Sequence, residues 1–345
     1  MRILEIGDNK AAGYCGRLFS LNGSEVIRVD LPTLTEASSI ETARDIYLHA
    51  GKKRVCIEYR QDAGQSLLTR LASECDMVIS DLSPIELDEI DWETLPTKLR
   101  VSITPFGRDG PYRTWKASGS TLLAMGGYTN LMGEEGREPL TLPGNYAEYQ
   151  AGQYAYTAAL ACTTYKSGCR NIDVSVLETV LSLSQFTTVM WTCQGVIRSR
   201  HGNRFGSLHP ISLYPCKDGS VFINIVPDFW PNLVDMLGKP ELLEDERFNT
   251  SPGRVENYKA LDAIIVEAFS RQTMSELLES GQRKYRLPIG EVMTMEQVLS
   301  DEHLNLRHYW CKVSVGDEVL KIPGLAFRTL PLKPQKNQTW VSKDG

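Results

Sequence analysis

Short apolar runs alternate with stretches of helical spacing along the first 125 residues. The apolar runs predict strands at 2–6, 25–29, 54–59, 77–80 and 100–104. Between them, apolar residues three or four apart predict helices at 14–21, 64–74 and 87–94. Strands that alternate with helices indicate βαβ units around a mostly parallel sheet, so we expect a Rossmann-like α/β domain. Ligands of such domains lie outside the carboxyl ends of the strands.

The second half of the chain carries a different pattern. A helix at 149–166, a strand at 171–176 and a long helix at 177–196 complete the first domain. The basic, glycine-containing stretch 198–209 is typical of a linker. Hairpins are then predicted at 211–226, around Lys217-Asp218-Gly219, and at 311–322. Helices are expected at 229–237, 258–270 and 273–279, which makes the second part a smaller α+β domain.

Several functional classes are disfavoured by motif and composition. The turn after the first strand contains only Gly7 and Gly13, so the GxGxxG fingerprint of NAD and FAD sites is missing. A net charge of −6 argues against a nucleic-acid partner. No apolar run is long enough for a membrane span, and the start lacks the pattern of a signal peptide. The eight cysteines are dispersed, so we expect a cytoplasmic protein without disulfides and without a bound metal.

The order of segments resembles the class III CoA-transferase family (CaiB/BaiF type), which includes formyl-CoA transferase, carnitine CoA-transferase and the α-methylacyl-CoA racemases. The resemblance spans nearly the whole chain. It rests on phrases such as KKRVCIEYR (52–60), CDMVISDLSPIELDEI (75–90), VSITPFGRDGPYR (101–113), YAEYQAGQYAYTAALACTTYKSG (146–168) and DVSVLETVLSL (173–183).

This resemblance implies an architecture and a reaction. It implies a large Rossmann-like CoA-binding domain (1–185), a linker helix and loop (186–209), a small domain (210–300) and a C-terminal segment that returns to the large domain (301–345). Two chains would interlock, with active sites at the subunit interface. The reaction would move CoA from an acyl-CoA donor to a carboxylic acid, with CoA as substrate and no permanently bound cofactor. A homodimer is expected, and a heteromer with a second family member is the alternative.

The resemblance also assigns site residues. Glu148 stands where the family has its nucleophilic aspartate, and a carboxylate can attack a thioester to form a mixed anhydride. Glutamate reaches one methylene further than aspartate. Lys10 and Lys116 fall where the family meets CoA, and Asp81 and Leu82 replace its Asn-Phe pair.

Other interpretations of these residues stay open. Glu148 would also suit the first turn of a helix, where the dipole favours an acid, and the two lysines would suit a solvated surface. The chain could be a non-catalytic or weakly catalytic partner subunit of a heteromeric transferase. Racemase chemistry is the least favoured, because Ser118 stands where that branch needs a histidine.

Overall fold

The computed structural model describes residues 1–7, 10–32, 38–164, 168, 170–328 and 337–341. These residues form two compact units. Unit 1 contains residues 1–128, 141–193 and 302–345, and unit 2 contains residues 129–140 and 194–301. Each unit has its own apolar core.

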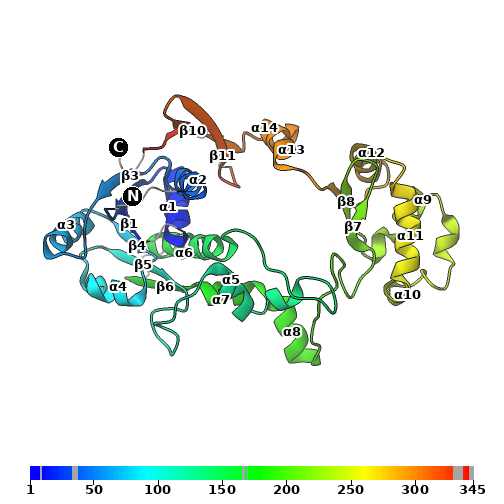
Figure 1. Cartoon of the computed structure of the whole chain (residues 1–345), viewed down its shortest axis with the longest axis horizontal. Coiled ribbons are helices and arrows are strands. Elements are labelled where there is room, and N and C mark those ends of the chain that lie inside the picture. Colours follow the sequence, from blue (N-terminus) through cyan, green and yellow to red (C-terminus); the bar gives the residue numbers. More distant parts are fainter. Residues whose placement is uncertain (8–9, 33–37, 165–167, 169, 329–336, 342–345) are drawn as a thin grey trace. The chain divides into compact units, whose positions relative to one another are not determined.

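Unit 1 is built on a six-stranded parallel sheet with the order β3-β2-β1-β4-β5-β6 (Figure 1). Its strands are β1 (Arg2–Ile6), β2 (Glu25–Asp30), β3 (Lys53–Cys56), β4 (Met77–Ser80), β5 (Leu99–Thr104) and β6 (Asn171–Ser175). The register pairs Ile3 with Val26 on one side of β1 and with Met77 on the other. The predicted Rossmann-like sheet is confirmed, and the strand order reverses between β1 and β4.

The four inner strands β2, β1, β4 and β5 are buried on both faces, because helices cover both sides of the sheet. Ile3 belongs to the core under α1 and α6, and its neighbour Leu4 belongs to the core under α3. The helices of unit 1 are α1 (Ala11–Leu21), α2 (Ser39–His49), α3 (Asp62–Ser73), α4 (Pro84–Glu89), α5 (Gly119–Met125), α6 (Tyr146–Thr164), α7 (Val176–Leu183) and α8 (Gln185–Gln194), with the 3₁₀ turn η1 (Trp92–Thr94).

Some predicted elements differ from the structure. The long helix expected at 177–196 is two helices, α7 and α8. The break follows from Ser184, whose hydroxyl donates to the Leu181 carbonyl at 2.8 Å and so competes with the helical ladder. The predicted strand at 54–59 ends at Cys56. Helix α2 was not predicted, although its start carries a capping box in which Glu41 N–H donates to the Ser38 hydroxyl.

Unit 2 packs helices on a three-stranded antiparallel sheet, and its first hairpin is confirmed. The sheet contains β7 (Ile211–Pro215), β8 (Ser220–Asn224) and β9 (Ile289–Glu291). The remaining elements are η2 (Thr129–Leu131), η3 (Pro227–Phe229), α9 (Trp230–Leu237), η4 (Pro240–Leu243), α10 (Ser251–Glu256), α11 (Tyr258–Phe269), α12 (Met274–Glu279), the π-helical turn η5 (Ser280–Lys284) and α13 (Met295–Ser300). Trp230, Phe248 and Phe269 fill its core.

The C-terminal residues of unit 1 form a further small sheet. It follows α14 (Glu302–Leu306) and contains β10 (Trp310–Val315), β11 (Glu318–Pro323) and β12 (Gln338–Thr339). The predicted hairpin of β10 and β11 is confirmed. Trp340 donates its indole N–H to Asp45 of α2 at 2.7 Å, which ties the sheet to the large domain. Residues 331–336 of the tail lie outside the described residues.

Candidate active site

The candidate site lies at the carboxyl edge of the parallel sheet, beside the point where the strand order reverses. Gly7 follows β1 and Asp81 follows β4, the two strands on either side of that point. Helices α1, α2 and α6 lead from this edge back to the start of the next strand, so their first turns gather there (Figure 1). An edge of this kind is where ligands of parallel sheets bind.

Asp81 holds the start of α1. Its carboxylate accepts from the Ala12 N–H at 3.0 Å, which satisfies a donor that a helix start leaves free. Gly7 makes the approach sterically feasible: it has φ 137°, and a Cβ there would lie 2.0 Å from Asp81 Oδ1. The negative charge of Asp81 therefore occupies the helix start at which dinucleotide folds bind phosphate. Leu82 is 4% exposed and packs in the core under α3, so it presents almost no surface to a ligand.

Glu148 is the third residue of α6, and its side chain is 12% exposed. Its Oε1 accepts from the Gly119 N–H at 3.1 Å and lies 3.9 Å from the ammonium of Lys10. Its Oε2 is buried and has no hydrogen-bond partner among the described residues. One carboxylate oxygen is thus held by a hydrogen bond, and the other is covered by surrounding atoms without being bound by any described residue.

Local sequence explains why Gly119 is placed to bind Glu148. Ser118 caps α5 by accepting from the Thr121 N–H, so Gly119 is the first helical residue and its own N–H points out of the helix. A Cβ on Gly119 would lie 2.3 Å from Glu148 Oε2. Only glycine leaves room here for the longer carboxylate.

The two predicted lysines occupy different surroundings. Lys10 immediately precedes α1, and its side chain is 39% exposed, with the ammonium directed to Glu148. Lys116 is exposed in the loop before α5. The structure thus brings Lys10, Gly119 and Glu148 together, and it leaves the Lys116 side chain in contact with solvent.

Three tyrosine rings, one each from α1, α2 and α6, pack against one another near the start of α6. Tyr149 of α6 stacks on Tyr14 of α1 with 4.9 Å between ring centroids. Tyr47 of α2 lies 5.9 Å from Tyr149 and 6.4 Å from Tyr14. The guanidinium of Arg17 covers the outer ring, 4.4 Å from the Tyr47 centroid. Nothing in the sequence pattern indicated that Tyr14, Tyr47 and Tyr149 would meet, because they come from three helices that are far apart along the chain.

A buried charge cluster, formed by Glu5, Arg28, His49 and Lys52, lies under α1 and α2. Glu5 accepts from Lys52 Nζ at 2.6 Å and from Arg28 Nη1 at 3.3 Å. Lys52 also donates to the Gly13 carbonyl at 2.8 Å, which ties the cluster to α1. Burial lowers the pKa of Lys52 to about 8, against the attraction of Glu5, and burial lowers the pKa of His49 well below its usual value. The cluster therefore fixes the position of α1 through Lys52. Because it is buried, the loss of one charged partner would destabilise the fold.

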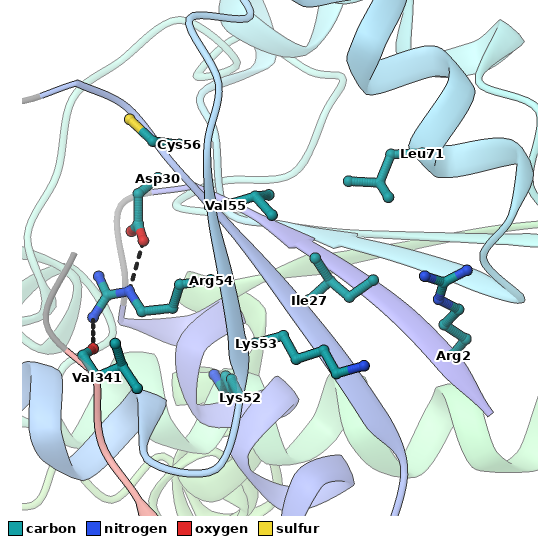
Figure 2. Close-up of a pocket in the computed structure, with 10 residues that line it drawn as sticks. All are labelled: Arg2, Ile27, Asp30, Lys52, Lys53, Arg54, Val55, Cys56, Leu71 and Val341. Atoms are coloured by element: carbon teal, nitrogen blue, oxygen red, sulfur yellow. Dashed lines mark hydrogen bonds and ion pairs between the residues drawn. The ribbon is translucent and has the colours of Figure 1, made fainter. Parts of the chain in front are cut away.

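A hollow of about 690 Å³ follows the edge strand β3 (Figure 2). Val55 and Leu71 line its apolar part, and Arg54 crosses it to bind Asp30 at 2.7 Å. Neither Glu148 nor Lys10 lines it. The hollow is therefore separate from the candidate site.

Neither a metal site nor a membrane-spanning helix is found in the part of the chain that the structure describes. No three His, Cys, Asp or Glu side chains there come together as metal ligands would. No described helix combines the length and the apolar character that crossing a bilayer requires.

Known proteins match this chain over most of its length. The sequence model of CoA-transferase family III matches residues 1–339. A succinyl-CoA–D-citramalate CoA-transferase of Chloroflexus aurantiacus is 31% identical over 327 residues, which covers 89% of this chain and 81% of that protein. The BbsE subunit of succinyl-CoA:(R)-benzylsuccinate CoA-transferase of Thauera aromatica is 25% identical, covering 86% of this chain and 79% of that subunit.

The fold matches as well. A crystal structure of a CaiB/BaiF family protein from Brucella suis superposes with a TM-score of 0.84 at 24% identity, covering 100% of this chain and 96% of that one. The family match spans both units and agrees with the parallel sheet and with the resemblance in the sequence phrases. The chain belongs to CoA-transferase family III.

Proposed function

We propose that this protein transfers CoA from an acyl-CoA donor to a carboxylic acid, with Glu148 as the nucleophile. The proposal rests on the contacts that the two oxygens of the Glu148 carboxylate make. Gly119 N–H holds Oε1 at 3.1 Å, the Lys10 ammonium lies 3.9 Å away, and Oε2 has no hydrogen-bond partner among the described residues. A carboxylate that is held at one oxygen and makes no hydrogen bond at the other keeps a lone pair for attack on a thioester carbon.

The chemistry proceeds by four balanced substitutions at carbonyl carbon. Glu148 attacks the donor thioester, the C–S bond breaks, and a mixed anhydride and CoA thiolate form. The thiolate attacks the Glu148 carbonyl of the anhydride, which gives a glutamyl-CoA thioester and releases the donor acid. The acceptor carboxylate attacks that thioester and releases the thiolate again. Attack of the thiolate on the acceptor acyl carbon yields the new acyl-CoA and restores Glu148, with no net proton transfer.

Positive charge around Glu148 supports these steps. The start of α5 and the ammonium of Lys10 attract the carboxylate and fix its direction. The same donors can stabilise the oxyanion that forms when Glu148 is itself the carbonyl under attack. Lys116 is exposed near α5, so we assign it to the CoA phosphates. A contact of Asp81 with CoA remains a prediction of the sequence, and so does one of Leu82, whose burial leaves it almost no surface for such a contact.

Hydroxylamine trapping tests the proposal. The protein is incubated with succinyl-CoA and then with hydroxylamine, which converts an activated Glu148 carbonyl to a hydroxamate. Mass spectrometry of the peptide that carries Glu148 should show this adduct, and Glu148→Gln should not form it. A wild-type protein that binds succinyl-CoA without ever forming the adduct would contradict the proposal.

The acids transferred are proposed to be short dicarboxylic acids. The relatives described above are named for succinyl-CoA and for citramalate or benzylsuccinate, and succinic, citramalic and benzylsuccinic acids all carry two carboxyl groups. Assays should therefore begin with succinyl-CoA as donor and with four- and five-carbon dicarboxylates as acceptors.

Gly119→Ala is expected to lower the rate of CoA transfer by about a hundredfold, because the new Cβ displaces the carboxylate that reacts. The helix itself should be unharmed, since alanine is the better helix former. Steady-state kcat and the melting temperature are measured together, with Ser120→Ala at the exposed next position as control. Unchanged kcat in Gly119→Ala would show that the position of Glu148 does not matter.

A second candidate function is that of a partner subunit. Glu148 replaces the aspartate that the family resemblance leads one to expect, and one relative is itself named as a subunit. Under this proposal the chain alone would form no adduct, and activity would appear only on mixing with a second family member.

We also propose that the chain is a dimer with its own copy. A row of exposed apolar side chains on α7 and α8 supports this: Leu181, Leu183, Phe186, Val189 and Trp191. Analytical ultracentrifugation of the pure protein measures its mass in solution and so distinguishes a dimer from a monomer.

A further inference from the structure

Two exposed aromatic rings, those of Tyr112 and Trp115, stack on each other in the loop that joins β5 to α5; we call them the ring pair. Their centroids lie 4.1 Å apart, their planes differ by 26°, and the two residues are 39% and 53% exposed. Phe106 of the same loop packs edge-on against both rings, with centroids at 5.5 and 6.2 Å, and also packs against the core of unit 1. The ring pair is thus anchored on one side and leaves apolar area on the other for a ligand to cover.

The loop that carries the ring pair is held in place by contacts with neighbouring elements. The Arg108 N–H donates to the Asp173 carboxylate of β6 at 2.9 Å, and the Arg108 side chain forms an ion pair with Glu93. Arg113 donates to the Arg108 carbonyl at 2.8 Å and forms an ion pair with Asp88 of α4. Because these contacts fix the backbone around the ring pair, little conformational entropy is lost when a ligand covers the rings.

The ring pair lies close to the candidate site. Trp115 precedes Gly119 by four residues, so their Cα atoms lie at most about 14 Å apart. The Gly119 N–H in turn binds Glu148 Oε1 at 3.1 Å. The loop also leaves the carboxyl end of β5, the edge of the sheet at which the candidate site lies. A ligand whose reacting end is at Glu148 can therefore reach the ring pair, and the exposed cation of Lys116 directly follows it.

We propose that Tyr112 and Trp115 bind the pantetheine arm of the acyl-CoA whose thioester reacts with Glu148. This rests on the proposed function and adds to it the residues that hold the arm. The arm joins the thioester to the diphosphate, so it spans the distance between Glu148 and Lys116, the residue that we assign to the phosphates. Its methyl groups and planar amides can pack on aromatic faces, and the apolar area that they bury favours binding. The adenine lies beyond the diphosphate and is farther from Glu148.

The test compares three thioesters of succinic acid as donors: those of CoA, of pantetheine and of N-acetylcysteamine. All three carry the same reacting group, but pantetheine lacks the nucleotide, and N-acetylcysteamine also lacks most of the arm. Trp115→Ala should lower kcat/KM about tenfold to a hundredfold for the first two donors, the scale of a lost aromatic contact. The loss should lie in KM, because the arm is bound equally before and during the reaction. The N-acetylcysteamine thioester should react as it does with the wild type.

Two variants support the interpretation of this loss. Trp115→Phe keeps an aromatic ring and should retain part of the preference for donors with the arm. Phe222→Ala removes a ring of similar exposure from β8 in unit 2 and should leave kcat/KM unchanged for all three donors. The melting temperature of each variant is measured alongside.

Every other pattern would overturn the inference. A loss for the CoA thioester alone would place the nucleotide, and not the arm, on the rings. An equal loss for all three donors would mean that Trp115 supports the fold of the site. No loss for any donor would leave the rings to another contact, such as a second copy of the chain, and CoA transfer would stand. If the wild-type protein transfers CoA from no acyl-CoA, the proposed function fails together with this inference.

Discussion

Glu148→Gln is expected to lower CoA transfer by roughly 10⁴-fold or more, the scale on which removal of a covalent nucleophile acts. The glutamine amide oxygen can still accept from the Gly119 N–H at the position of Oε1. The fold and the binding of acyl-CoA should therefore persist while the attacking carboxylate oxygen is gone. The measurement is steady-state transfer from succinyl-CoA, together with the melting temperature.

Two further variants show whether the loss of activity is specific to the Glu148 carboxylate. Glu296→Gln neutralises an exposed acid on α13 and should leave kcat unchanged. Glu148→Asp restores the aspartate of the family resemblance but shortens the reach by one methylene. Because the space beside Gly119 fits the longer glutamate side chain, the Glu148→Asp variant should retain only a small part of the activity. A Glu148→Gln protein with undiminished transfer would mean that another group attacks the thioester.

Glu5→Gln is expected to lower the free energy of unfolding by about 3–5 kcal/mol, the cost of breaking a buried ion pair. Glu5 is fully buried, and its two oxygens serve the ammonium of Lys52 and the guanidinium of Arg28. The change leaves the buried ammonium of Lys52 without its counter-ion, whereas Arg28 keeps Asp30 at 3.2 Å. Urea unfolding measures the change in unfolding free energy. Glu25→Gln is the control, because Glu25 on β2 forms its ion pair with Lys53 at the solvent-exposed surface. That control should unfold as the wild type does.

The loss in Glu5→Gln should depend on pH in a defined direction. Burial holds the pKa of Lys52 at about 8 in the folded chain, below its ordinary 10.5. Between these values the unfolded state binds more protons, so this residue makes stability rise with pH. Without Glu5, the folded pKa falls further, and the rise starts at lower pH. The difference in unfolding free energy between variant and wild type should therefore narrow as the pH rises to about 8 and change little above it, because both folded states have then lost the Lys52 proton. A difference that does not narrow below pH 8 would mean that Lys52 is not the group left unpaired.

Local pattern predicted the parallel sheet and both hairpins, because alternation and turn chemistry act over a few residues. Apolar runs such as Arg2–Ile6 and Met77–Ser80 are buried on both faces and show as such in the sequence. The polar turns at Lys217-Asp218-Gly219 and Gly316-Asp317 join strands that pair directly. Helix α2 escaped prediction because its apolar face is short, and only its capping box marked the start.

The sequence by itself determined the family, the α/β class and the position of Glu148 at the start of a helix. Tertiary structure alone decided what surrounds that carboxylate. Gly119 lies 29 residues from Glu148, Asp81 lies 69 residues from the N–H that it binds, and Lys52 lies 47 residues from Glu5. Contacts of this kind depend on the order of strands in the sheet and on the helices that meet at its edge. The physical reason is the separation along the chain over which each property acts. Periodicity and helix capping depend on neighbouring residues. Charge pairing, and the space left where a glycine has no Cβ, exist only after distant segments have packed together.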